Sequence, residues 1–144
     1  MPVQYLLDTN ILVHAIRIDD VWSRIQAHFQ LLAVDPTPMI SVVTAGELRS
    51  LAYQRGWGTA KLNQMEFMLG YYNLVNIDDA IIETYAIIDS QLQLRGHTLG
   101  KNDLWIAASA KVTGATLITT DKDFDCIHPE FLTRVWIDPD IKAA

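Results

Sequence analysis

The chain has 144 residues, half of them apolar, which is enough for one globular domain with its own core. Its single cysteine, Cys126, excludes an internal disulfide and favours a reducing compartment, and no apolar run approaches the roughly 20 residues that span a bilayer. The 11 basic and 17 acidic side chains give a net charge of −6, which argues against binding nucleic acid through a basic surface alone, unless some of the acids hold cations.

Short apolar runs alternate with segments of helical spacing along the whole chain. Strands are expected at residues 3–7, 39–43 (or a helix start there), 72–77, 115–119 and 131–137. Helices are expected at residues 22–32, 44–55, 59–69, 79–96 and 103–112, with caps at Asp78 or Asp79 and at Asn102. This alternation predicts an α/β domain with a mainly parallel sheet over residues 1–144, of which about the last six should fray.

Four acids stand at comparable places in this pattern. Asp8 and Asp121 follow predicted strands, while Glu47 and Asp103 fall in the first turns of predicted helices. The carboxyl ends of parallel strands and the amino ends of the helices that leave them share one edge of the sheet, so these side chains can converge. Clustered carboxylates suit hard cations such as Mg²⁺ and Mn²⁺.

Each acid also has a purely structural explanation. Asp8 could be a turn residue that bonds its own backbone. Glu47 could complete a capping box with Thr44, and Asp103 could face the positive end of its helix. The hypothesis of a metal site therefore rests on the four acids as a set.

Other sites of known chemistry do not fit the sequence. Asp121, Asp123 and Asp125 match the first positions of a calcium-binding EF-hand loop, but the glycine and glutamate that such a loop needs are absent. The histidines show no zinc-ligand spacing, and Cys126 is expected to be a packed side chain. The chain also has no P-loop, no dinucleotide fingerprint and no nucleophile elbow.

Four blocks of sequence together resemble a known family. They are Leu-Leu-Asp-Thr-Asn-Ile-Leu around Asp8, Ile-Ser-Val-Val-Thr-Ala-Gly-Glu-Leu up to Glu47, Gly-Lys-Asn-Asp-Leu-Trp-Ile-Ala-Ala around Asp103, and Leu-Ile-Thr-Thr-Asp-Lys-Asp-Phe around Asp121. In order and separation they look like the PIN-domain proteins of the VapC toxin type. The resemblance covers the chain from about residue 3 to residue 137.

The resemblance implies a three-layer α/β/α sandwich and a Mg²⁺- or Mn²⁺-dependent ribonuclease, while the single cysteine and the lack of a long apolar run favour the cytoplasm. It maps the metal-binding acids to Asp8, Glu47, Asp103 and Asp121, with Asp123 as a further candidate ligand and Asp125 solvated. It places Thr9 and Asn102 beside those acids as supporting polar groups. Its implied partners are RNA, an antitoxin protein and a second copy of the chain, with no membrane.

Three basic residues, Lys101, Lys122 and Arg49, flank the proposed acids. They are candidates for phosphate contacts, although basic side chains beside a turn or a helix start are commonly just solvated. The helices at residues 44–55 and 59–69 carry apolar side chains that could contact a partner protein or pack on their own core.

Two rival hypotheses belong to other classes of protein. A phospho-acceptor receiver domain also gathers acids at strand ends, but it needs a lysine where this chain has Thr119 and Thr120. A PIN-like module without catalysis, which only binds RNA or protein, is the other alternative. Binding of Mn²⁺ through Asp8 and Asp103 would distinguish a nuclease from such a module.

Overall fold

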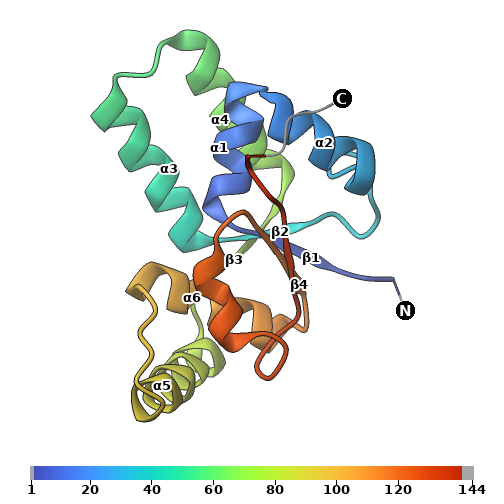
Figure 1. The fold of residues 1–144 in the computed structure, drawn as a ribbon. Coiled ribbons are helices and arrows are strands. Elements are labelled where there is room, and N and C mark those ends of the chain that lie inside the picture. The colour runs from blue at the N-terminus through green and yellow to red at the C-terminus, as the bar shows by residue number, and fades with distance from the viewer. Residues whose placement is uncertain (1, 141–144) are drawn as a thin grey trace.

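The computed structural model describes residues 2–140, and its strands form one five-stranded sheet (Figure 1). The strands are β1 (Tyr5–Leu7), β2 (Met39–Ser41), β3 (Asn73–Val75), β4 (Thr116–Thr119) and β5 (Arg134–Trp136). They lie in the order β3-β2-β1-β4-β5, and every neighbouring pair is parallel. The α/β prediction is therefore confirmed. The expected fraying of the last residues falls mainly on residues 141–144, which lie outside the described residues.

Helices cover both faces of this sheet. They are α1 (Thr9–Arg17), α2 (Asp20–Phe29), α3 (Val42–Arg55), α4 (Thr59–Tyr71), α5 (Asp79–Leu94), α6 (Lys101–Thr113) and the short 3₁₀ helix η1 (Lys122–Ile127). Figure 1 shows α1 to α4 on one side of the sheet and α5 and α6 on the other. The fold is thus the expected three-layer α/β/α sandwich.

Successive residues of the strands divide between two hydrophobic cores. One core, with α1 to α4, receives Leu7, Ile40 and Ile118 from the sheet. The other, with α5 and α6, receives Leu6, Met39 and Leu117. Because side chains alternate across a strand and both faces are covered, the strands read as continuous apolar runs. None of the helices within residues 2–140 has the length and apolar character that a bilayer crossing requires.

The topology places the carboxyl end of β1 in the middle of one sheet edge. β1 pairs with β2 on one side and with β4 on the other, so the chain order reverses around it. In open parallel sheets a ligand site commonly forms at such a switch point. α1 and α3 start at this edge because they leave β1 and β2, and α6 starts there because it runs back towards the beginning of β4.

One helix was not predicted from the sequence. No helix was expected between the strand that ends before Asp8 and the helix at residues 22–32, but Thr9 to Arg17 form α1, with Asp8 as its N-cap. The helix pattern assigned to residues 22–32 is too long at its end, because α2 stops at Phe29. The last predicted strand shrinks to three residues, and η1 was also missed.

Two predicted helix caps are wrong. Ser41, rather than Thr44, caps α3 by accepting from the backbone N–H of Val43, so the Thr44–Glu47 capping box does not form. Glu47 consequently lies in the second turn of α3 instead of the first. At α6 the cap position belongs to Gly100, and Asn102 is the second helical residue. At α5, Asp78 is the cap and accepts from Ile81.

Candidate metal centre

Asp8 is held in place through both of its carboxylate oxygens. It directly follows β1, is only 3% exposed, and caps α1. Its Oδ1 accepts from the backbone N–H of Thr9 at 2.8 Å, and its Oδ2 accepts from the hydroxyl of Thr119 at 2.7 Å. Since a carboxylate oxygen has two lone pairs, each oxygen can still bind a further partner. Asp8 is therefore oriented without being saturated.

A chain of hydroxyl groups positions Glu47. The Thr9 hydroxyl donates to Glu47 Oε1 at 2.7 Å and lies 3.0 Å from the buried hydroxyl of Thr44. Because the single hydroxyl proton of Thr9 is used on Glu47, Thr44 is the donor in the second contact. Thr9 thus contacts Asp8 through its backbone and Glu47 through its side chain, and it links the first two acids.

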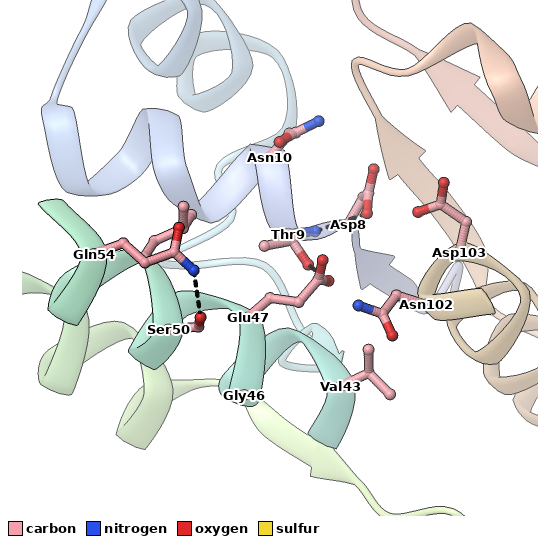
Figure 2. A pocket seen from close by; sticks show the side chains of 11 residues that line it. Asp8, Thr9, Asn10, Val43, Gly46, Glu47, Ser50, Gln54, Asn102 and Asp103 are labelled. Atoms are coloured by element: carbon pink, nitrogen blue, oxygen red, sulfur yellow. Dashed lines mark hydrogen bonds between the residues drawn. The ribbon is translucent and has the colours of Figure 1, made fainter. Parts of the chain in front are cut away.

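Asp103 reaches the same place from the other side of the sheet. It stands half-buried in the first turn of α6, and its carboxylate faces Asp8 (Figure 2). Asn102 precedes it and is exposed, with its amide between Asp103 and Glu47 in Figure 2. Three elements that are far apart in the sequence therefore bring three carboxylates together.

The remaining acids follow β4. The backbone N–H of Asp121 donates to the Thr119 hydroxyl at 2.9 Å, and Asp121 Oδ1 accepts from the backbone N–H of Asp123 at 2.8 Å. Carboxylate oxygens of Asp103, Asp121 and Asp123 lie within 4.8 Å of one another. Asp125 is exposed, as expected, but it also forms an ion pair with Arg134 at 2.7 Å.

Burial and mutual repulsion raise the pKa of two of these acids. For Asp8, burial is the main cause and raises the pKa from 3.8 to about 6, although the hydrogen bonds from Thr119 and Thr9 lower it. For Asp103, burial is again the main cause, and the charges of Asp8, Asp121, Glu47 and Asp123 add to it, so the pKa reaches about 7. The five acids therefore act as one electrostatic group.

This set of donors fits a hard divalent cation. Of the ion pairs within residues 2–140, none involves one of the five acids. Crowded carboxylates without a counter-charge must either take up protons or bind a cation. Their oxygens, with no thiolate or imidazole in the cluster, are the ligands that Mg²⁺ and Mn²⁺ prefer. Asp103, Asp121 and Asp123 form the closest group of such ligands.

The acids open onto a cleft of about 550 Å³. Asp8, Glu47 and Asp103 line one part of it, and Ser50 and Gln54 on α3 line another (Figure 2). A cleft of this size, open on one side, is large enough to admit part of a polymeric substrate beside the carboxylates.

Comparison with known protein families decides where the chain belongs. The model of the PIN domain matches residues 5–127, a span that contains all five acids. The chain belongs to the PIN domain family. This confirms the resemblance seen in the four blocks of sequence.

Individual similar proteins show which members of the PIN domain family this chain resembles. Ribonuclease VapC1 of Haemophilus influenzae (strain R2866) is 31% identical over 126 residues, which are 85% of this chain and 91% of the relative. The crystal structure of VapBC2 from Rickettsia felis bound to a DNA fragment from their promoter has 26% identity and a TM-score of 0.81, covering 94% of this chain and 100% of the other. The structure of VapBC-5 from Mycobacterium tuberculosis, a member of the VapBC family of toxin-antitoxin systems, has 25% identity and a TM-score of 0.69, covering 93% and 100%. The PIN domain described here is homologous to the VapC toxin ribonucleases of VapBC toxin-antitoxin systems.

The three basic residues that flank the acids of this PIN domain have different surroundings. Lys101 is exposed at the start of α6, in a hollow that it shares with Glu47 and Asp103. The Lys122 ammonium lies 4.6 Å from the ring centre of Trp136. Arg49 forms an ion pair with Glu66 on α4 at 2.6 Å and lines a different cavity, between α3 and α4. Of the three, Lys101 is the one that lines a hollow together with two of the acids.

The PIN domain site also uses a residue to which the sequence-based hypothesis gave no role. The hydroxyl of Thr119 is fully buried, donates to Asp8 and accepts from the backbone of Asp121. The signal in the sequence is a hydroxyl residue at the end of a strand, two positions before an acid. That signal gains meaning only when β4 is known to lie beside β1.

Proposed function

We propose that this PIN domain is a Mg²⁺- or Mn²⁺-dependent endoribonuclease and the toxin of a VapBC-type pair. The observation that carries the proposal is the convergence of Asp8, Glu47 and Asp103 on one cleft, with Asp121 near enough to raise the pKa of Asp103 and no ion-pair partner for these acids among the described residues. Homology to VapC ribonucleases supports the reaction class.

The side chains have distinct parts in this proposal. Asp8, Glu47, Asp103 and Asp121 would hold the metal, and Asp123 is a further ligand candidate. When bound, the cation would lower the pKa of a water molecule and offset charge on the phosphate. Thr9 and Thr119 keep the carboxylates oriented, and Asn102 offers an amide donor at the edge of the cleft.

Hydrolysis in this proposal is an attack of water on phosphorus. The new bond joins the water oxygen to phosphorus, the bond from phosphorus to the 3′ oxygen breaks, and that oxygen takes up a proton. The products carry a 5′-phosphate and a 3′-hydroxyl. The route through the 2′-hydroxyl commonly needs a pair of general acid and base groups such as histidines, and no histidine lines the cleft; His14 pairs with Asp19 instead.

A cleavage assay tests the proposal. Total RNA and folded transfer RNAs are incubated with wild type and with Asp103→Asn, in Mg²⁺, in Mn²⁺ and in EDTA. We expect metal-dependent cutting by wild type and a rate lowered by orders of magnitude in the variant. Asp103→Asn is preferred to a change at Asp8, because Asp8 is buried and caps α1, so its loss could unfold the chain.

Asp125→Asn is the matched control. Asp125 lies in the same acidic stretch but outside the metal-ligand cluster, paired with Arg134. Cleavage should persist in this variant. Full activity of Asp103→Asn, or cutting that continues in EDTA, would contradict the proposed site. A folded wild type that cuts no RNA would favour the non-catalytic interaction module.

We also propose two protein partners, an antitoxin and a second copy of the chain. The similar structures come from VapBC systems. Large apolar side chains on α3 and α4 are open to solvent, with Tyr53 89% and Phe67 50% exposed. Light scattering should give twice the 16.2 kDa of one chain. Co-expression with the small protein encoded beside it should yield a complex that no longer cuts RNA. A mass of one chain at high concentration would contradict the dimer.

A further inference from the structure

The cleft extends beyond the carboxylates into an arm without charged side chains. We call this part, lined by Asn10 on α1 and by Ser50, Leu51 and Gln54 on α3, the neutral arm. The metal-binding proposal uses none of these residues. Their presence on the walls of the same cleft raises the question of which part of a substrate they face.

Helix geometry makes the neutral arm a direct continuation of the acidic site. Glu47, Ser50 and Gln54 follow one another at spacings of three and four residues, so they share one face of α3. Seven positions separate Glu47 from Gln54, a rise of about 10 Å along the helix. Figure 2 shows Gln54 and Ser50 on α3, in line with Glu47, and Asn10 at the start of α1. The arm therefore has a length on the order of one nucleotide.

The lining of the arm favours a base over a phosphate. It holds no basic side chain, and the carboxylates next to it repel anions. Leu51 supplies an apolar surface for the flat face of a ring, and the amides supply hydrogen bonds for its edge. An unpaired base next to a phosphate held at the acids would reach this arm.

Gln54 is the side chain best placed to read the edge of a base. Its Nε2 donates to the Ser50 hydroxyl at 2.8 Å, which restrains the amide while leaving its carbonyl oxygen and a second N–H proton for a ligand. A carboxamide that donates and accepts side by side matches adenine. Sequence-specific recognition of RNA is mostly directed at unpaired bases of this kind.

We propose that the neutral arm is a subsite for one unpaired RNA base next to the scissile phosphate, and that Gln54 determines which base is preferred. This inference rests on the proposed ribonuclease function. It adds a specificity-determining residue that is separate from the metal-binding acids.

The test is the cleavage profile of an RNA pool randomised around the cut. Wild type should prefer one base at a position adjacent to the cut, and Gln54→Ala should weaken that preference about tenfold, the equivalent of one lost hydrogen-bonded base contact. Cutting of the other sequences should continue. Gln54→Glu, which only accepts, should shift the preference towards cytosine.

Gln93→Ala on α5 is the matched control for this test. Gln93 is an exposed glutamine outside the cleft, and its amide donates to the side chain of Asp89 four residues earlier, as that of Gln54 does to Ser50. Its replacement removes the same kind of side chain and the same kind of intrahelical bond. The Gln93→Ala variant should therefore keep the wild-type cleavage profile.

A second measurement separates this inference from the proposed function. Binding of labelled hexa-adenylate, hexacytidylate, hexaguanylate and hexauridylate is compared for Asp103→Asn and for Asp103→Asn with Gln54→Ala. Unequal affinities that become equal without Gln54 support the subsite, even if wild type cuts nothing and the nuclease proposal fails. Cutting with an unchanged profile in Gln54→Ala overturns the subsite alone. An unchanged profile with weaker inhibition by the antitoxin would assign the arm to a peptide, which also overturns it.

Discussion

The hydroxyl of Thr119 shows how a neutral side chain can organise charged ones. It joins Asp8, at the end of β1, to Asp121, in the loop after β4, although the two acids are more than a hundred residues apart. Its proton and one of its lone pairs are both in use, and the residue is fully buried. The bond it donates also lowers the pKa of Asp8, against the effect of burial. Thr119 therefore helps to keep a buried carboxylate available to a cation.

Replacing Thr119 by valine should weaken metal binding. Valine keeps the shape but loses both hydrogen bonds, so Asp8 and Asp121 lose their common anchor and the pKa of Asp8 rises further. We expect the affinity for Mn²⁺, measured by calorimetry, to fall about 10- to 100-fold. Thr113→Val is the control, because its hydroxyl bonds only backbone carbonyls at the far end of α6. Equal affinities in the two variants would refute the role of Thr119.

The raised pKa of Asp103 predicts how pH acts on the metal-free fold. Its pKa is about 7 in the folded chain and near 3.8 when unfolded, so between these values the folded state binds more protons. Stability from this group is full below pH 3.8 and is lost as pH rises through 7. Urea unfolding in EDTA should therefore show Asp103→Asn gaining stability relative to wild type between about pH 5 and pH 8.

The exposed Asp35 provides the control for this pH experiment. Asp35→Asn, in the loop before β2, removes a carboxylate that is open to solvent. Its stability relative to wild type should not change over the same pH range. If Asp103→Asn behaves in the same way, burial and the neighbouring acids do not raise the pKa of Asp103 as described.

At the scale of elements, α1 was missed although its sequence carries a helical pattern. Asn10, His14 and Arg17 stand at spacings of four and three residues among buried side chains, which is the pattern of an amphipathic helix. The Asp8-Thr9-Asn10 sequence is equally typical of a turn. Strands and the more exposed helices were predictable because their apolar pattern or flanking glycines and prolines were distinct. Because Ser41 rather than Thr44 caps α3, Glu47 lies almost one turn further into the helix than predicted, and it therefore stays close to the predicted helix face.

Two glycines on neighbouring helices should respond to alanine with opposite signs. Gly56 closes α3 with a φ of +58°, a left-handed conformation that disfavours any side chain, whereas Gly70 lies in α4 with open space around it. We expect Gly56→Ala to lower the free energy of unfolding by about 1 kcal/mol and Gly70→Ala to raise it by about 0.5–1 kcal/mol. Urea titrations measure both. If both variants changed the free energy of unfolding in the same direction, the local backbone conformation would not set the stability of the α3–α4 pair.

At the scale of the whole molecule, the position of the acids was predictable from the expected sheet topology, but the hydrogen bonds and ion pairs around them were not. Any parallel sheet with this order brings the ends of β1 and β4 together, so Asp8 and Asp121 had to approach one another. The sequence does not indicate that the Thr119 hydroxyl bridges them or that Arg49 pairs with Glu66 across two helices, because both contacts depend on tertiary structure that no local pattern encodes. The neutral arm likewise exists only once α1 and α3 face each other across the cleft.

The assembled site predicts that divalent cations stabilise the entire fold. The acids proposed as its ligands come from the residue after β1, from α3, from α6 and from the loop after β4, so the unfolded chain cannot present them together. A ligand that binds only the folded state adds about 2.7 kcal/mol at a hundred times its dissociation constant, or roughly 5–10 °C in melting temperature for a chain of this length. Calorimetry in Mn²⁺ and in EDTA should show this rise for wild type and for Asp35→Asn, and little of it for Asp103→Asn. An equal rise in Asp103→Asn would mean that the cation stabilises the protein from another place, and the assignment of the acidic cluster as its site would have to be given up.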